Sequence, residues 1–510
     1  MRIKSLWVKE YKNLKDVYID FDENNWITAL IGWNGTGKSN VIEALSVIFR
    51  DLIQTKHDAL FSFKIAYICN NYLIEIDALS AKDFLIERRN GANRDKFEIV
   101  ICNLDNQNTK EKYRLQLNKF YKDEIKYIPR YIFGYYSGNS DRMQKIFLDY
   151  GQKYDRELRQ GKDPGARRLF FTLPAHSQFV LLAFILQQDK STQEFLEKQL
   201  GIDTESAVDS VLFVLKQPPW KNQGGDHRFW NAEGIVSRFL SDLFDLSIAP
   251  IRIKRTIDTT LWNTKKQEFL YLYIKDIDTL KKLIIGKTPK ELFRDLESTY
   301  VSELIEEVRI FIKLKNNDGY ITFNELSEGE RQLLTVLGLL KFTSEDESLI
   351  LLDEPDTHLN PKWSTDYFDF LRNIVATSGN DYNDKSHIIV TTHNPLSIAE
   401  LIKEQVQILI RDPEKQSISV KPPIDDPRGM GYAGIITSDM FGLGAALDKH
   451  TLELLEERRL ITLKETPLSE KEKERVSEIN QILKPYGFQH EARDPKFRDY
   501  LKSLQKGKEK

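Results

Sequence analysis

Short apolar runs between turn residues predict β-strands in the first third of the chain. Alternating or continuous apolar runs of about four to eight residues favour strands over helices. Such runs lie at residues 2–9, 17–21, 26–31, 72–76, 97–101 and 131–135. From Lys38 the apolar positions, among them Val41, Ile42 and Leu45, take a helical spacing instead. The chain is therefore predicted to pass from a strand into a helix across residues 32–37.

The middle of the chain is predicted to be mainly helical. The apolar run 179–186 and the longer stretch 292–312 favour helices, and the prolines and glycines of residues 217–225 predict a loop between them. A sustained heptad pattern is missing, so we do not expect a long coiled coil. Strand character returns in two short apolar runs at residues 349–352 and 387–391.

The C-terminal part combines a proline-rich linker with a helical tail. The linker covers residues 421–427. Ser469 followed by Glu472 is a capping-box pattern, and Pro485 and Gly487 end the helix that begins there. The predicted domains are an N-terminal half at 1–139, a helical insert at 140–312, a C-terminal half at 313–420 and a partner-binding tail at 421–510.

Composition excludes several classes of protein. A chain of 510 residues is too long for one ordinary core, and 41% apolar with 30% charged residues excludes a disordered chain. Two cysteines exclude a disulfide framework and a four-cysteine zinc site. The longest uninterrupted apolar run, residues 179–186, is eight residues long and well short of the ~20 residues of a membrane span, and the first residues do not resemble a secretion leader. We therefore expect a cytoplasmic protein without a membrane partner.

The charge balance allows nucleic acid to bind only at a local patch. Lys and Arg number 74 against 77 Asp and Glu, a net charge of −3. Three basic clusters are candidates for phosphate contacts or, alternatively, ordinary solvated surface: Arg252, Lys254 and Arg255; Arg88, Arg89 and Arg94; Arg167 and Arg168. Aromatic residues within 131–136 could stack on bases, but at strand spacing they fit a core better.

Residues 32–39, GWNGTGKS, match the phosphate-binding loop in full. Its glycines let backbone N–H groups converge on phosphate oxygens, and the following helix adds its positive N-terminal end. Lys38 is predicted to contact the β- and γ-phosphates of ATP, and the Ser39 hydroxyl to ligate Mg²⁺. The predicted nucleotide-binding residues are Gly32, Asn34, Gly35, Thr36, Gly37, Lys38, Ser39 and Asn40.

A second motif is an apolar run that ends in two carboxylates. Residues 349–352 are followed directly by Asp353 and Glu354. A buried strand of this kind can deliver Asp353 to a magnesium ion, and Glu354 can orient or deprotonate an attacking water.

A third motif, LSEGE at residues 326–330, opens a predicted helix. Its exposed N–H groups and the Ser327 hydroxyl could bind phosphate. A second anion-binding loop is redundant unless it contacts the nucleotide of another copy, which predicts a head-to-tail dimer in which Ser327, Gly329 and Glu330 act in trans. The alternative is an ordinary helix cap formed by Ser327 with Glu330.

Two histidines follow the acidic pair. His393 ends the run 387–391, where an imidazole could contact a γ-phosphate, although a lone histidine is more often structural. His358 and Asn360 follow Glu354 closely, where an opposing protomer could meet them.

These motifs, in this order, resemble the ABC-type ATPases, in particular the branch that includes SMC, RecF and OLD-like proteins. The distance in sequence between Ser39 and Leu326 is far longer than in transporter subunits. The resemblance implies an α/β P-loop head, a mixed sheet flanked by helices, with a large helical insert and a helical tail. It also implies Glu354 as hydrolytic base and His393 as switch residue.

One expected residue is not assigned. The family glutamine that follows a strand between the first two motifs is not obvious, although residues 133–138 stand roughly where it should be. Glu328 also occupies a position where the family commonly has glycine.

Segments 135–138, 175–183, 353–363 and 436–442 more closely resemble the PtuA family, the ATPases of Septu anti-phage systems. This resemblance implies a separate HNH nuclease, PtuB, as partner and, in retron versions, a reverse transcriptase with its RNA–DNA product. Beyond His393 we find neither an Asp-x-Asp pair nor a histidine cluster, so we expect no nuclease centre in this chain. Two alternatives stay open: a RecF-type ATPase that clamps DNA, and a nucleotide-dependent scaffold with negligible turnover.

Overall fold

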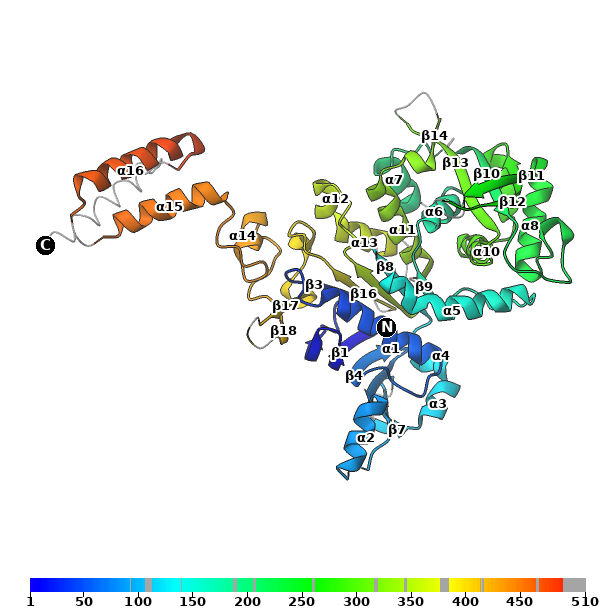
Figure 1. The fold of residues 1–510 in the computed structure, drawn as a ribbon, viewed down its shortest axis with the longest axis horizontal. Helices are drawn as coiled ribbons and strands as arrows, with labels where there is room; N and C mark the ends of the chain where they lie inside the picture. The colour runs from blue at the N-terminus through cyan, green and yellow to red at the C-terminus, as the bar shows by residue number, and fades with distance from the viewer. Residues whose placement is uncertain are drawn as a thin grey trace. The chain divides into compact units, whose positions relative to one another are not determined.

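The computed structural model forms two compact units, Met1–Ile435 and Ile436–Lys510. It describes residues 1–488 except 92, 106–111, 139, 187–189, 205–207, 259–261, 316–319, 344–345, 377–384, 413, 415–416 and 465–466. The last residues of the predicted tail, 489–510, lie outside this part of the chain. Figure 1 shows the elements along the chain.

A seven-stranded sheet forms the centre of the first unit, in the order β18-β17-β3-β16-β15-β8-β9. Neighbouring strands are parallel except for the β17–β18 pair. The strands are β3 (Ile27–Ile31), β8 (Tyr131–Tyr136), β9 (Leu169–Phe171), β15 (Ser348–Asp353), β16 (Ser386–Thr391), β17 (Val406–Arg411) and β18 (Ile418–Lys421). Strands β3, β15 and β16 are buried along their whole length, as their continuous apolar runs predict. Strand β3 comes from the N-terminal part of the chain, and its neighbours β16 and β17 come from residues 386–411. The N-terminal and C-terminal parts of the unit therefore share one sheet, which confirms the predicted α/β fold.

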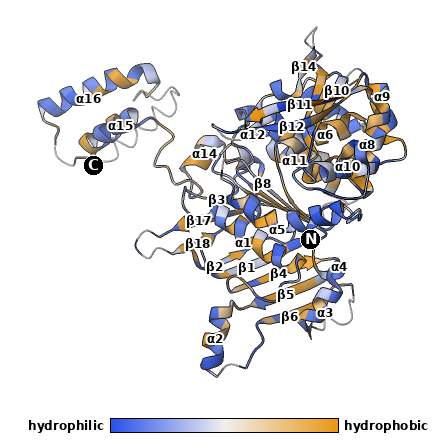
Figure 2. Cartoon of the chain, turned by 45° about the vertical axis from the view of Figure 1, so that its right-hand side comes forward, coloured by the Kyte–Doolittle hydropathy of each residue, from blue (hydrophilic) through white to orange (hydrophobic). Residues whose placement is uncertain are grey.

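A second, six-stranded sheet is antiparallel throughout, in the order β2-β1-β4-β5-β6-β7. Its strands are β1 (Arg2–Tyr11), β2 (Leu14–Asp20), β4 (Phe63–Cys69), β5 (Tyr72–Ala78), β6 (Phe97–Asn103) and β7 (Lys112–Leu115). Buried and less buried residues alternate along most of β4 and β5, and Figure 2 shows the strands of this sheet as largely hydrophobic. Helix α1 (Lys38–Ile53) shares one hydrophobic core with both sheets, through residues such as Val41, Ile65 and Leu351. This core fixes the phosphate-loop helix against the central sheet.

The segment 140–312 is not purely helical, which corrects the expectation of a helical insert. It contains helices, but it also contributes most of a five-stranded antiparallel sheet in the order β11-β12-β10-β13-β14. Its strands are β10 (Val208–Lys216), β11 (Ile248–Asp258), β12 (Thr264–Ile274), β13 (Ile305–Lys313) and β14 (Tyr320–Thr322).

The stretch 292–312 shows why one of these strands, β13, was not predicted. Its first part belongs to helix α10 (Pro289–Val301), and the chain turns at Glu303, whose φ is 59°. Its second part is β13, in which Val308, Ile310 and Ile312 are buried on one face. One stretch thus contains a helix and a strand. The alternation of apolar and polar residues along the strand is interrupted by Phe311, which puts an apolar residue between Ile310 and Ile312.

Further helices lie between and after these strands in the chain. They are α2 (Ala81–Arg89), α3 (Leu117–Lys122), α4 (Glu124–Tyr127), α5 (Arg142–Arg159), α6 (Ala175–Leu186), α7 (Lys190–Lys198), α8 (Gly234–Leu246), α9 (Ile277–Lys281), α11 (Glu328–Thr343), α12 (Pro361–Thr365), α13 (Tyr367–Ala376) and α14 (Tyr432–Thr437). Helix α11 packs against α6 and α13. In the part of the chain that is described, none of the helices has the length and apolar character needed to cross a membrane.

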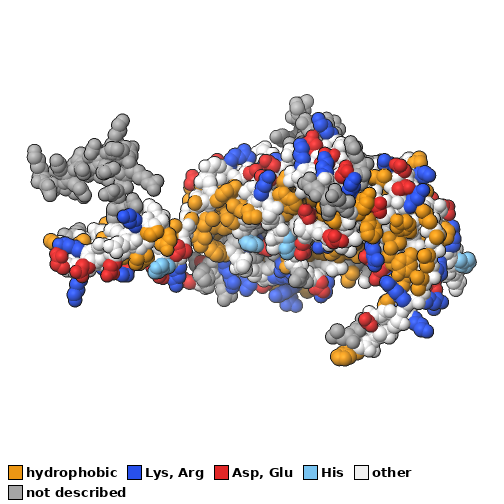
Figure 3. Space-filling view, turned by 90° about the horizontal axis from the view of Figure 1, so that it is seen from above, with side chains coloured by type: hydrophobic (Ala, Val, Ile, Leu, Met, Phe, Trp, Pro, Cys, Tyr) orange, Lys and Arg blue, Asp and Glu red, His pale blue; other side chains and the backbone are white. Residues whose placement is uncertain are grey.

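The second unit contains a pair of helices, α15 (Lys449–Thr462) and α16 (Glu470–Leu483). Leu454, Ile479 and Leu483 form its small core. The predicted capping box is present, since Ser469 Oγ accepts from the Glu472 amide and the Glu472 carboxylate accepts from the Ser469 amide at 2.8 Å. Basic and acidic side chains are mixed over the face shown in Figure 3, in keeping with the small net charge.

Candidate nucleotide site

The glycine-rich loop between β3 and α1 takes a backbone shape that requires glycine. Gly32, Gly35 and Gly37 have φ values of 146°, 83° and 94°. A Cβ at Gly32 would lie 2.4 Å from the Leu409 carbonyl oxygen, and one at Gly37 would lie 2.9 Å from a Leu14 methyl group. The loop therefore has the open, side-chain-free form that fits a phosphate group.

Lys38 brings a positive charge into this loop. Its ammonium group donates to the Gly32 carbonyl at 2.7 Å and to the Trp33 carbonyl at 3.4 Å. Burial lowers the pKa of Lys38, while the nearby carboxylates of Glu354 and Asp353 act to raise it. A buried cation inside a ring of backbone groups suits an anionic ligand.

The other predicted loop residues hold the loop to its surroundings. The Thr36 hydroxyl donates to the Trp33 carbonyl at 2.8 Å, and the Asn40 amide group donates to Asn13 Oδ1 at 2.5 Å. Asn13 in turn donates to the Gly35 carbonyl at 3.1 Å, and Asn34 is exposed. Asn13 was not predicted from the sequence, because it lies in the turn between β1 and β2 and outside the phosphate-loop motif.

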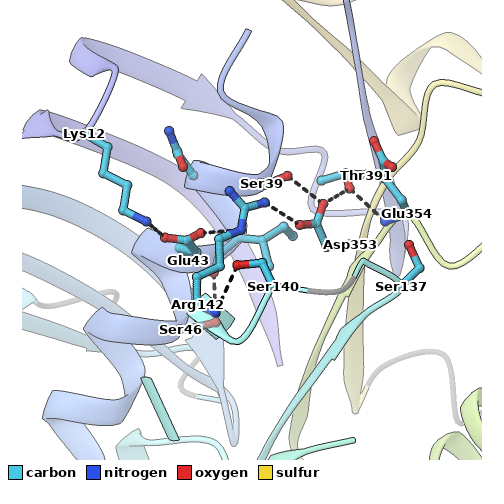
Figure 4. Close-up of polar contacts among 12 residues, drawn as sticks. Lys12, Ser39, Glu43, Ser46, Ser137, Ser140, Arg142, Asp353, Glu354 and Thr391 are labelled. Atoms are coloured by element: carbon cyan, nitrogen blue, oxygen red, sulfur yellow. Dashed lines mark hydrogen bonds and ion pairs between the residues drawn. The ribbon is translucent and has the colours of Figure 1, made fainter. Parts of the chain in front are cut away.

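Ser39 and Asp353, predicted to bind magnesium, meet directly. The Ser39 hydroxyl donates to Asp353 Oδ1 at 3.0 Å, and Thr391 donates to the same oxygen (Figure 4). The parallel pairing of β15 with β16 places Asp353 opposite Thr391. Asp353 is fully buried, and burial raises its pKa even though these hydroxyls and Arg142 act to lower it. A hydroxyl beside a carboxylate is an oxygen pair that fits Mg²⁺.

Glu354 stands at the end of the same strand in a left-handed conformation, with φ of 52°. Its amide donates to the Thr391 carbonyl and hydroxyl, both at 3.1 Å. Its carboxylate lies 3.2 Å from Nδ1 of His393, and the two side chains are 27% and 52% exposed. The structure thus brings the two predicted catalytic residues together where water can reach them.

The signature residues begin α11 and contact the loop after Glu354. The Ser327 hydroxyl accepts from the Glu330 amide at 3.3 Å, and the Glu330 carboxylate accepts from the Ser327 amide at 2.7 Å. This is the ordinary helix cap that the sequence left open as an alternative. A Cβ at Gly329 would lie 2.5 Å from the His358 carbonyl oxygen. The signature turn and the His358 loop therefore touch within one chain.

The residues after Glu354 have roles within the fold. The His358 imidazole lies 3.8 Å from the Glu328 carboxylate, and the Asn360 side chain caps α12 by accepting from the Trp363 amide at 2.9 Å. Asp356 is buried and accepts from the hydroxyls of Thr392 and Ser397. These contacts tie the loop to the end of β16.

Arg142 occupies the region where the unassigned family glutamine was sought. It follows β8, which pairs with β15 so that Tyr136 stands opposite Asp353. Its guanidinium lies 3.5 Å from Asp353 and 3.1 Å from Glu43 on α1, and Lys12 also pairs with Glu43 (Figure 4). Sequence reasoning missed this group because its members belong to separate segments without a common motif.

Two family models match the chain. One, described as "AAA ATPase domain", matches residues 1–213. The other, described as "AAA domain, putative AbiEii toxin, Type IV TA system", matches residues 244–399. Together they cover both parts of the site, and they support nucleotide binding and ATPase activity in general.

The curated relatives include a Septu protein and a retron ATPase. Septu protein PtuA of Bacillus mycoides (strain KBAB4) is 26% identical over 222 residues, 43% of this chain and 29% of PtuA. The chain is thus similar to PtuA and carries matches to two ATPase domain models. The "Retron Vc95 probable ATPase" of Vibrio cholerae is 21% identical over 441 residues, 80% of this chain and 73% of that protein. The match to PtuA covers 29% of PtuA, which is less than a third of its length.

Two further comparisons give a shorter match and a structural match with a low TM-score. The "Probable peptide export ATP-binding protein YydI" of Bacillus subtilis (strain 168) is 29% identical over 103 residues, 20% of this chain and 46% of that protein. Among solved structures, an Smc head bound to the C-terminal winged-helix domain of ScpA has a TM-score of 0.33 and 14% identity, covering 83% of this chain and 98% of that one.

Proposed function

We propose that the chain binds and hydrolyses ATP as the regulatory subunit of an anti-phage defence complex. The observation that carries the proposal is the meeting of Ser39 with Asp353 at 3.0 Å beside the phosphate loop, with Glu354 next in the chain. Segments more than three hundred residues apart in sequence thus supply a phosphate cradle, an oxygen pair for Mg²⁺ and the Glu354 carboxylate.

Each residue has a defined task in this proposal. The loop amides and Lys38 hold the β- and γ-phosphates. Ser39 and Asp353 hold Mg²⁺, which neutralises phosphate charge when bound. Glu354 accepts a proton from the attacking water, and His393, at 3.2 Å, orients the carboxylate and contacts the γ-phosphate.

The second part of the proposal concerns partners. Similarity to PtuA and to a retron ATPase supports a defence role. We therefore expect a separate HNH nuclease of the PtuB kind, and a reverse transcriptase with its RNA–DNA product where a retron is attached. Two heads would close over two nucleotides, with Ser327, Gly329 and Glu330 of one copy completing the site of the other. In this scheme the nuclease centre belongs to the partner, and the assembly is cytoplasmic.

The test is phosphate release by the purified chain and its Glu354→Gln variant. Loss of a general base reduces turnover by about 10²- to 10⁴-fold, so the variant should lose hydrolysis and still bind ATP, as measured with a fluorescent analogue. Glu306→Gln, on β13, removes a similar exposed charge and serves as control. Equal turnover in wild type and Glu354→Gln would contradict the assignment, and negligible turnover in the wild type would favour a scaffold.

A further inference from the structure

Arg142 lies between two buried carboxylates from different elements. Its Nε is 3.1 Å from Glu43 Oε1, and its Nη2 is 3.5 Å from Asp353 Oδ2. The side chains of Glu43 and Asp353 are 1% and 0% exposed, whereas that of Arg142 is 35% exposed. One guanidinium therefore forms ion pairs with Glu43 on the phosphate-loop helix and with Asp353 at the end of the acidic strand.

Neighbouring groups hold Arg142 without fixing it to one partner. The Tyr136 ring lies beneath the guanidinium, 5.1 Å from ring centre to the guanidinium carbon. Lys12 pairs with the second oxygen of Glu43, and the Tyr11 hydroxyl lies 3.4 Å from it. Because Lys12 already compensates Glu43, the charge of Arg142 is available to Asp353. Burying these two carboxylates without neighbouring cations would lower the free energy of unfolding.

The chemistry of Arg142 differs from that of the amide expected in this region. A glutamine oxygen can ligate a metal ion, whereas a guanidinium has five N–H donors and no acceptor. Asp353 is also the carboxylate that, under the proposed function, holds Mg²⁺ with Ser39. A guanidinium and a divalent cation beside one carboxylate repel each other.

We propose that Arg142 is a resident counter-ion of Asp353 that competes with Mg²⁺, and that Glu43 retains the guanidinium when Asp353 is taken by the metal. This inference rests on the proposed function. Arg142 is the first residue of α5, which packs against α1, α8 and α10. A move of its guanidinium from Asp353 to Glu43 would therefore change the contacts at the start of this helix. Arg142 is thus a positioning residue that links metal loading to the insert.

The experiment is a magnesium titration of fluorescent ATP-analogue binding by the full chain carrying Glu354→Gln, so that hydrolysis does not interfere. With Arg142→Gln added, and equally with Arg142→Met, whose side chain has no oxygen to ligate Mg²⁺, the Mg²⁺ concentration at half-saturation should fall about threefold or more, because a competing positive charge is gone. Arg142→Lys, which keeps the charge, should stay near the parent value. Arg156→Gln, an exposed position on the same helix, is the matched control.

A second readout is the melting temperature without nucleotide. It should fall in Arg142→Gln, since Asp353 loses its counter-ion, and fall less in Arg142→Lys. A lower melting temperature with an unchanged magnesium requirement would mean a purely structural role and would overturn the inference. A higher magnesium requirement in Arg142→Gln would also overturn it, because Arg142 would then assist the nucleotide. Absence of binding in the parent at any magnesium concentration would instead overturn the proposed function, and this inference with it.

Discussion

At the scale of single residues, Asp353 shows how function opposes stability in this site. It is fully buried, shares the Arg142 guanidinium with Glu43, and accepts hydrogen bonds from Ser39 and Thr391. These partners do not fully offset burial, so its pKa is raised. A carboxylate kept ionised in such surroundings is ready for a cation and is a cost to the protein without one.

Asp353→Asn is therefore predicted to raise the melting temperature of the ligand-free protein at pH 7. Because the folded pKa of Asp353 lies above its unfolded value, the folded chain retains this proton where the unfolded chain has lost it. The contribution of this group favours folding below the unfolded pKa and declines as the pH rises through the folded pKa. Asparagine imitates the protonated form, so the gain, about 1–3 °C, should vanish at low pH.

Calorimetry of both proteins from low to neutral pH measures this difference. The same variant should lose magnesium-dependent ATP binding, because an amide is a poor replacement for the carboxylate. A melting temperature that falls at pH 7 would contradict the prediction and show that the ion pair with Arg142 outweighs the cost of burial.

At the scale of elements, the first turn of α11 packs directly on the loop that follows the acidic strand. Gly329 is required here by space, since an added methyl carbon would lie 2.5 Å from the His358 carbonyl oxygen. Gln332, on the same helix, donates to the Pro355 carbonyl. The signature turn thus has a role within its own chain, besides the contact with a partner's nucleotide that we propose.

Gly329→Ala is predicted to destabilise the isolated chain by about 1–3 kcal/mol, the usual cost of forcing an extra carbon into a packed site. Unfolding in denaturant measures the change. Gly444→Ala is the control, since its added methyl group would meet open space. If Gly329→Ala were as stable as the control, the contact with the His358 loop would not be as close as described.

At the scale of the whole molecule, the central sheet and its surroundings combine residues from the first 31 positions with residues beyond position 346. The terminal ammonium of Met1 pairs with Glu347, and β3 inserts between β16 and β17. Helix α11 begins beyond the insert, and Ser327 at its N-terminus is exposed. This exposed turn is the surface that a second copy would use under the proposed function.

ATP is predicted to convert the Glu354→Gln protein into dimers, because nucleotide that is not hydrolysed keeps two heads closed. Ser327→Arg should prevent this change, since a long side chain would block the turn, and should leave ATP binding intact. Light scattering gives the mass with and without ATP. Gln160→Arg, an exposed position at the end of α5, adds the same charge and should still dimerise. Dimers of Ser327→Arg equal to the control would refute the trans contact.

The sequence by itself determined the local chemistry of this protein. The phosphate loop, the acidic strand and the capping box of Ser469 with Glu472 are contiguous patterns, so backbone conformation and neighbouring hydrogen bonds follow from a few adjacent residues. The shared central sheet was also predictable, because its strands are continuous apolar runs of the kind that parallel sheets bury.

Only the tertiary structure decided which distant side chains meet. Glu43, Arg142 and Asp353 carry no common motif, and they come together because α1 packs against both α5 and β15. The sheet formed by β10 to β14 was likewise not predicted. The stretch 292–312, for example, is compatible with a helix or a strand, and the strand β13 within it is defined by its pairing with β10. Side-chain pairs between segments and strand partners depend on non-local contacts, which a linear pattern does not contain.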